Sequence, residues 1–123
     1  MRAKQMRILL ADDQAKVRSA LRFLLEQQPD IEILGEAVDA TGLLDWLTAA
    51  CPDLVLLDWE LPGFSSDSLV ALKELRPSLV VIALSGRPEA RRAALRVGAD
   101  AFVSKGDPPE QLLAAIEACR RHG

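Results

Sequence analysis

The sequence predicts one α/β domain, a parallel sheet with helices on both faces, and three observations lead to this class. Short runs of leucine, valine and isoleucine alternate with segments whose apolar residues recur every three or four positions. Three of these runs are continuously apolar, as expected of strands buried on both faces. The connections are short, and the 123 residues match the size of one domain, so residues 1–123 are taken as a single unit.

Five runs are expected to be strands. The continuously apolar ones contain Ile8–Ala11, Leu54–Leu57 and Leu79–Leu84, whereas residues 31–33 alternate between apolar and polar, as in an edge strand. The predicted bounds are Arg7–Ala11, Ile31–Glu36, Asp53–Leu57, Leu79–Leu84 and Ala101–Ser104.

Each strand is followed by an apolar stripe at helical spacing, so five helices are expected. The stripes are Val17, Ala20, Leu21, Leu24 and Leu25; Leu43, Leu44, Leu47, Ala50 and Cys51; Leu69, Leu72 and Leu75; Ala90, Ala93, Ala94 and Val97; and Leu112, Leu113, Ile116 and Cys119. Asp107 is expected to cap the fifth helix, with Pro108 at its first position. The positions of Cys51 and Cys119 predict buried, unreactive thiols.

Topology rules then suggest how the strands are ordered. Crossovers between parallel strands are right-handed, so helices lie on both faces only if the strand order reverses once. With five strands this favours the order 2-1-3-4-5, in which the first and third strands are neighbours at the reversal. The order follows from these rules and from the precedent of such folds, not from particular residues.

Composition excludes several classes of function. The net charge of −3 and the isoelectric point near 5.1 leave no basic footprint, so this segment is not expected to bind nucleic acid directly. No apolar run could cross a membrane and no signal peptide is present, which predicts a cytoplasmic protein. Two cysteines do not make a disulfide framework, and a lone histidine excludes a Ser-His-Asp triad.

Chemically active side chains follow four of the five strands. Asp12 and Asp13 follow the first, Asp58 the third, Ser85 the fourth, and Lys105 lies at the end of the fifth. Because open parallel sheets bind ligands beyond the carboxyl ends of their strands, these residues are expected to meet at one rim.

Clustered carboxylates repel each other unless a cation joins them, and oxygen ligands without His or Cys favour Mg²⁺, or Mn²⁺ as a similar ion. With a lysine for phosphate and a hydroxyl to donate, the set matches phosphoryl transfer onto Asp58. Each residue alone has a plainer explanation: Asp13 as a helix cap, Lys105 as an exposed lysine, Ser85 as part of a turn.

In order along the chain, these residues resemble the receiver domain of two-component response regulators, over essentially the whole chain. The segments that carry the likeness are Ile8–Asp13, Asp53–Gly63, Ala83–Gly86 and Gly98–Lys105. The resemblance implies a flavodoxin-like (CheY-like) fold. Leu34–Ala37 and Asp107–Ile116 look most like the subfamily with helix-turn-helix (NarL/LuxR-type) output domains.

The resemblance also implies a role for each residue of the metal site. Asp58 would accept a phosphoryl group from a histidine kinase or a phosphotransfer protein. Asp12 and Asp13 would hold Mg²⁺, with Asp58 and the backbone carbonyl of Glu60 as further ligands. The change at Asp58 would be limited to its own phosphorylation and dephosphorylation, so no turnover enzyme is expected.

Three further residues would respond to the phosphoryl group. Lys105 would pair with it, and Ser85 would hydrogen-bond it. Phe102 would change rotamer as Ser85 moves, which would alter the face made by the fourth helix, the fifth strand and the fifth helix. The resemblance is compatible with a homodimer. It is also compatible with a DNA-binding output domain outside this chain, and the segment is therefore expected to be either a free-standing receiver or an N-terminal domain.

Two other functions stay open at this point. An aspartyl-phosphate phosphatase commonly has a second acid two residues after its nucleophile, and Glu60 weakly mimics that acid. A receiver fold could also serve as an interaction module without phosphorylation, although the complete acidic set argues against it. Trp59 and Glu60 are expected to line the mouth of the site. Because Gly106, not proline, follows Lys105, a cis bond between them is less expected.

Overall fold

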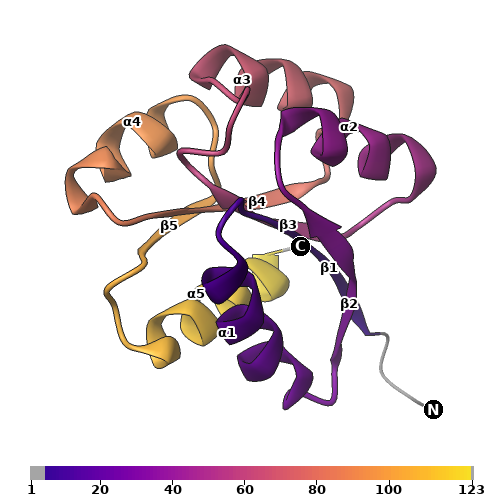
Figure 1. Cartoon of the computed structure of the whole chain (residues 1–123), viewed down its shortest axis with the longest axis vertical. Helices are drawn as coiled ribbons and strands as arrows, with labels where there is room; N and C mark the ends of the chain where they lie inside the picture. Colours follow the sequence, from indigo (N-terminus) through magenta and orange to yellow (C-terminus); the bar gives the residue numbers. More distant parts are fainter. Residues whose placement is uncertain (1–4, 123) are drawn as a thin grey trace.

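The computed structural model describes residues 5–122 and contains one five-stranded parallel sheet (Figure 1). The strand order β2-β1-β3-β4-β5 confirms the predicted order. The strands are β1 (Met6–Ala11), β2 (Ile31–Ala37), β3 (Leu54–Asp58), β4 (Val80–Ser85) and β5 (Ala101–Ser104). The helices are α1 (Ala15–Glu26), α2 (Ala40–Ala49), α3 (Ser66–Leu75), the 3₁₀ turn η1 (Pro88–Ala90), α4 (Arg91–Arg96) and α5 (Pro109–His122).

The helices cover both faces of the sheet, as the strand order requires. Figure 1 shows α2, α3 and α4 on one face, and α1 and α5 on the other. Two apolar clusters lie beneath these layers, one built around Leu9, Val55 and Val81 and the other around Leu10 and Leu56. The alternation of neighbouring residues between the two clusters is the period-two pattern of strands buried on both faces. No helix among residues 5–122 is long and apolar enough to cross a membrane.

The ends of β3 and β4 lie one residue later than the sequence predicted. Asp58 pairs with Leu84, and Ser85 pairs with Ser104, so both site residues belong to the sheet instead of following it. Asp53 lies just before β3, and its carboxylate accepts a hydrogen bond from the N–H of Arg7 at 2.8 Å. The acceptor candidate is therefore held by a rigid strand and not by a loop.

Parts of the predicted helical stripes are wrong. Leu44 and Leu75 are 53% and 76% exposed, because Leu43 and Leu47 of α2 and Leu69 and Leu72 of α3 fill the core. Cys51 lies after α2 and is exposed, which contradicts its prediction as a core thiol. Ala20 and Ala93 are exposed as well, and Cys119 is partly buried.

Two predicted helix starts are also corrected. Asp107 does not cap α5: its carboxylate accepts the N–H of Ser104 at 3.1 Å, and the helix begins at Pro109. The fourth helix is shorter than its stripe, because η1 occupies its first turn. At α1 the N-cap is Gln14. The described residues contain no cis peptide bond, so the bond from Lys105 to Gly106 is trans.

Candidate functional site

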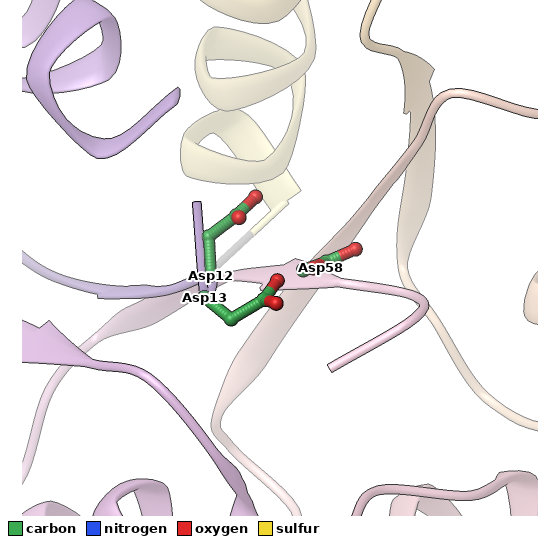
Figure 2. Close-up of side chains that lie close together, drawn as sticks. All are labelled: Asp12, Asp13 and Asp58. Atoms are coloured by element: carbon green, nitrogen blue, oxygen red, sulfur yellow. The ribbon is translucent and has the colours of Figure 1, made fainter. Parts of the chain in front are cut away.

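Three carboxylates meet at the carboxyl end of the sheet, as the sequence predicted. One oxygen each of Asp12, Asp13 and Asp58 lies within 4.8 Å of the other two (Figure 2). The strand register explains this proximity: β1 and β3 are neighbours, and Ala11 pairs with Leu57. The residues that follow this pair are Asp12, just after β1, and Asp58, the last residue of β3.

Two of these acids are buried. Asp12 is 1% and Asp58 is 2% exposed, whereas Asp13 faces solvent. The N–H of Gln14 donates to Oδ1 of Asp12 at 2.8 Å, and the N–H of Glu60 donates to Oδ1 of Asp58 at 3.0 Å. Each buried carboxylate is thus held by the backbone two residues further on, which fixes its orientation.

Lys105 supplies the positive charge. Its Nζ lies 2.8 Å from Oδ2 of Asp12, 3.4 Å from Oδ1 of Asp58 and 3.3 Å from Oε1 of Gln14. The N–H of Lys105 donates to the carbonyl of Ser85 at 2.8 Å, so the lysine backbone is fixed to the end of β4. Gln14 is a contact that the sequence analysis missed, since only its position after the acidic pair could have drawn attention to it.

The electrostatics of the site follow from burial. Burial raises the pKa of Asp58 above its ordinary value, and the charge of Asp12 adds to this, while the Glu60 N–H and Lys105 oppose it. Burial alone would lower the pKa of Lys105, but the carboxylates of Asp12 and Asp58 outweigh it and raise that pKa. The lysine therefore stays charged, and this one cation is paired with two buried carboxylates.

The donor set fits a hard divalent cation. Within residues 5–122, Oδ2 of Asp12 is buried and has no hydrogen-bond partner, although it forms the ion pair with Lys105. Such an oxygen retains lone pairs for a cation, and the exposed Asp13 leaves the cluster open to solvent. Three carboxylates without a histidine or cysteine nearby are the ligand chemistry of Mg²⁺. That the carbonyl of Glu60 is also a ligand stays a prediction.

Ser85 is fully buried at the end of β4, one residue beyond the register partner of Asp58. Its hydroxyl is engaged by the side chain of Glu60, a contact that the sequence analysis did not predict. Phe102 is 6% exposed and packs in the core cluster on the α4 side of the sheet. Trp59 is partly buried against the same cluster, and its predicted place at the mouth of the site stays a prediction.

Comparison with known proteins shows the family to which the chain belongs. A family model described as the response regulator receiver domain matches residues 8–117. The chain belongs to this family. The receiver domain is 36% identical over 112 residues to the nitrate/nitrite response regulator protein NarL of Escherichia coli K12, and 34% identical over 122 residues to the phosphate regulon transcriptional regulatory protein PhoB of the same strain. These matches cover 89% and 94% of this chain and 52% of each relative, so the receiver domain spans about half the length of both.

Solved structures show the same fold. The isolated receiver domain of RcsB from Salmonella enterica serovar Typhimurium, solved with the phosphomimetic BeF₃⁻, is 27% identical, with a TM-score of 0.87 over 96% of this chain and 90% of that one. The receiver domain of the putative response regulator NarL from Mycobacterium tuberculosis shares the fold with a TM-score of 0.86 at 24% identity, covering 97% and 98% of the two chains. The predicted CheY-like fold and the predicted family are therefore confirmed.

Proposed function

We propose that this receiver domain is a phosphorylation-controlled switch whose acceptor is Asp58. The observation that carries the proposal is the convergence of Asp12, Asp58 and Lys105, in which one charged lysine lies within 3.4 Å of both buried carboxylates. A carboxylate beside a charged lysine and an open acidic cluster has the parts that a phosphoryl transfer needs: a nucleophile, fixed positive charge and a cation site.

The transfer is assigned to the free oxygen of Asp58. Oδ1 is held by the N–H of Glu60 and faces Lys105, which leaves Oδ2 to attack phosphorus. The new O–P bond forms as the P–N bond of a phosphohistidine breaks, and the imidazole nitrogen keeps the bonding electrons and takes up a proton. Asp12, Asp13 and Asp58, with the Glu60 carbonyl, would hold Mg²⁺, which supplies charge neutralisation at the phosphoryl oxygens.

Two residues would then report the phosphoryl group to the rest of the domain. Lys105 would pair with it, and the 3.4 Å distance from its Nζ to Oδ1 of Asp58 supports this role. Ser85 is the hydroxyl donor nearest to the acceptor in the strand register. Movement of Ser85 toward the phosphoryl group would free space for a new rotamer of Phe102, and so change the face made by α4, β5 and α5. Such a change is a two-state equilibrium that the added charge biases.

The partners follow from the same proposal. A histidine kinase or a phosphotransfer protein would supply the phosphoryl group, and a DNA-binding output domain outside this chain would receive the signal. Support comes from the matched relatives, since PhoB is named a transcriptional regulatory protein and is about twice as long as this chain. We infer that the full-length protein regulates transcription, with a homodimer as one means of control.

The test is phosphorylation by a small donor. We expect acetyl phosphate with Mg²⁺ to add one phosphoryl group to the domain, measured as the increase in intact mass, and chelation of Mg²⁺ to prevent it. Asp58→Asn should abolish the addition, because the amide is not a nucleophile for phosphorus. Asp67→Asn, which removes an exposed acid in the first turn of α3, is the matched control and should label normally. Label that persists in Asp58→Asn rejects the assignment.

The phosphatase alternative gains no support from the position of Glu60. Its carboxylate is hydrogen-bonded to Ser85 and paired with Arg87, and so does not stand free as a second acid beside Asp58. An interaction module that is never phosphorylated would need no buried carboxylate pair around a lysine. The labelling experiment distinguishes the switch from both alternatives, because neither alternative predicts a stable single phosphoryl group on Asp58.

A further inference from the structure

The side chain of Glu60 closes over the hydroxyl of Ser85. The two carboxylate oxygens of Glu60 lie 3.0 and 2.9 Å from Oγ of Ser85, which is fully buried. A carboxylate has no hydrogen to give, so the hydroxyl donates. The N–H of Arg87 donates to the same Oγ at 3.0 Å. The single hydrogen of the Ser85 hydroxyl is therefore committed to Glu60.

Arg87 completes the arrangement, which we call the clasp and define as Glu60, Ser85 and Arg87. Nη2 of Arg87 lies 3.1 Å from Oε2 of Glu60. The clasp connects the loop after β3 to the segment between β4 and η1. It is also anchored at the acceptor, because the N–H of Glu60 donates to Asp58. A change at Asp58 thus reaches the clasp through one residue.

The clasp and the phosphoryl group need the same hydrogen. Under the proposed function, on which this inference rests, the Ser85 hydroxyl donates to a phosphoryl oxygen on Asp58. The hydroxyl cannot donate fully to both acceptors, because it has only one hydrogen to give. We propose that the clasp is an autoinhibitory contact, in which Glu60 competes with the phosphoryl group for Ser85, so that loading of Asp58 opens the clasp.

The contacts of the clasp are strong enough to lower the affinity of the site for a phosphoryl group, but too weak to prevent its binding. The side chains of Arg87 and Glu60 are 59% and 42% exposed, and solvent weakens an ion pair of that kind. The hydrogen bond from the buried hydroxyl to a charged acceptor is the stronger part. Together they should reduce the affinity of the site for a phosphoryl mimic by about three- to tenfold, the range of one charge-assisted hydrogen bond in partial contact with water.

The first experiment measures the binding of beryllofluoride at saturating Mg²⁺ by the fluorescence of the two tryptophans. Glu60→Gln removes the charge and the Arg87 ion pair while keeping the backbone, and should tighten binding by about three- to tenfold. Glu89→Gln is the matched control, because Glu89 is an exposed acid in η1 and its loss changes the net charge equally. Unchanged affinity in Glu60→Gln, or an equal gain in Glu89→Gln, would overturn the proposal.

The variant Arg87→Gln distinguishes two explanations, the clasp and a purely electrostatic effect of Glu60 on anion binding. If Glu60 acts only as a nearby negative charge, then loss of the positive Arg87 must weaken the binding of the anion. The clasp predicts the opposite: Arg87→Gln frees Glu60 to leave Ser85 and so tightens binding, by less than Glu60→Gln does. Weaker binding in Arg87→Gln therefore overturns the proposal.

A double-mutant cycle with Ser85→Ala completes the test. Without the hydroxyl Glu60 has nothing to hold, so Glu60→Gln should give no gain in the Ser85→Ala background. A gain that persists there shows that Glu60 acts without Ser85 and overturns the clasp. Wild-type protein that binds no beryllofluoride would overturn the proposed function and the clasp together. Wild-type binding that Asp58→Asn abolishes, with no effect of Glu60→Gln, would overturn the clasp alone.

Discussion

Lys105 forms its shortest ion pair with Asp12, at 2.8 Å between Nζ and Oδ2. The same ammonium lies further from the acceptor candidate Asp58, at 3.4 Å. The lysine therefore neutralises Asp12, which follows β1, more closely than Asp58, and its ammonium is near enough to Asp58 to pair with a group bound there. Lys105 would therefore stabilise the unphosphorylated fold through Asp12, and its ammonium would remain close enough to Asp58 to pair with a phosphoryl group there.

Removal of the lysine should consequently destabilise the fold. Lys105→Met leaves Asp12 and Asp58 buried without their cation, and the free energy of unfolding at neutral pH should fall by about 2 kcal/mol, somewhat less than for a fully buried pair because Lys105 is partly exposed. Urea unfolding measures this, and Mg²⁺ should restore more stability to this variant than to wild type. Lys105→Arg, which keeps the charge, is the control, and an equal loss in both variants would show that side-chain shape matters and not charge.

Asp58 should have the opposite effect to Lys105 on stability: its buried charge should lower the free energy of unfolding of the metal-free domain at neutral pH. Its pKa is raised in the fold, first by burial, so the folded protein binds more protons than the unfolded chain between the unfolded value of 3.8 and the higher folded value. Stability from this group is thus present at low pH and lost as pH rises through that window. Asp58→Asn should stabilise the metal-free domain at neutral pH by about 1 kcal/mol, the ordinary scale of a single substitution.

The pH dependence provides the check on Asp58. The advantage of Asp58→Asn over wild type should shrink as the pH falls toward 3.8, when the wild-type carboxyl becomes neutral. Urea unfolding of both proteins at several pH values in the presence of a chelator measures it, with Asp67→Asn as an exposed reference. An advantage that does not vary with pH would mean that burial of the charge is not its source.

Magnesium should stabilise the domain through the exposed member of the acidic cluster. A ligand that binds only the folded state raises the free energy of unfolding by about 1.4 kcal/mol at ten times its dissociation constant and by about 2.7 kcal/mol at a hundred times. Asp13→Ala should remove most of this gain and leave the metal-free stability nearly unchanged, because Asp13 is exposed. Thermal melts with and without Mg²⁺ measure it, and a full Mg²⁺ effect in Asp13→Ala would exclude Asp13 as a ligand.

The sequence predicted the positions of the buried acids well because general rules decide them. Strand order follows from the handedness of crossovers, and a residue at the end of a buried strand must reach the carboxyl edge of the sheet. Together with the precedent of such folds for the strand order, these rules were enough to predict the convergence of Asp12, Asp58 and Lys105. The one-residue shift of β3 and β4 arose because a strand ends where its neighbour stops pairing, which no single segment reveals.

The contacts of long side chains in loops could not be predicted from the sequence. Glu60 and Gln14 lie in loops, and nothing in their spacing indicates that one holds Ser85 and the other Lys105. The exposure of Leu75 has a similar origin, since an apolar residue at the end of a helix can match the stripe and still lie beyond the sheet that it would cover. Periodicity predicts which face of a helix is apolar, but not where the core ends.

Gly35 offers a prediction that depends on a close contact the sequence did not reveal. The register between β1 and β2 shifts between Ile8 and Leu9, and Gly35 pairs with Leu9 directly after this irregularity. The indole of Trp46 lies against Gly35, and its Nε1 donates to the carbonyl of Glu36 at 3.1 Å. A Cβ at position 35 would lie 2.2 Å from Cζ2 of Trp46, which is far inside contact distance.

Gly35→Ala should therefore displace the partly buried tryptophan and destabilise the domain by about 1–3 kcal/mol, the usual cost of overpacking. Gly86→Ala is the matched control, because a Cβ there meets nothing within 4 Å and its φ is not positive. Its stability should stay within about 0.5 kcal/mol of wild type or rise slightly, since alanine restricts the unfolded chain. Denaturant midpoints measure both variants. Equal stability of the two would mean that Trp46 moves aside without cost, and that the packing of α2 on β2 does not depend on this glycine.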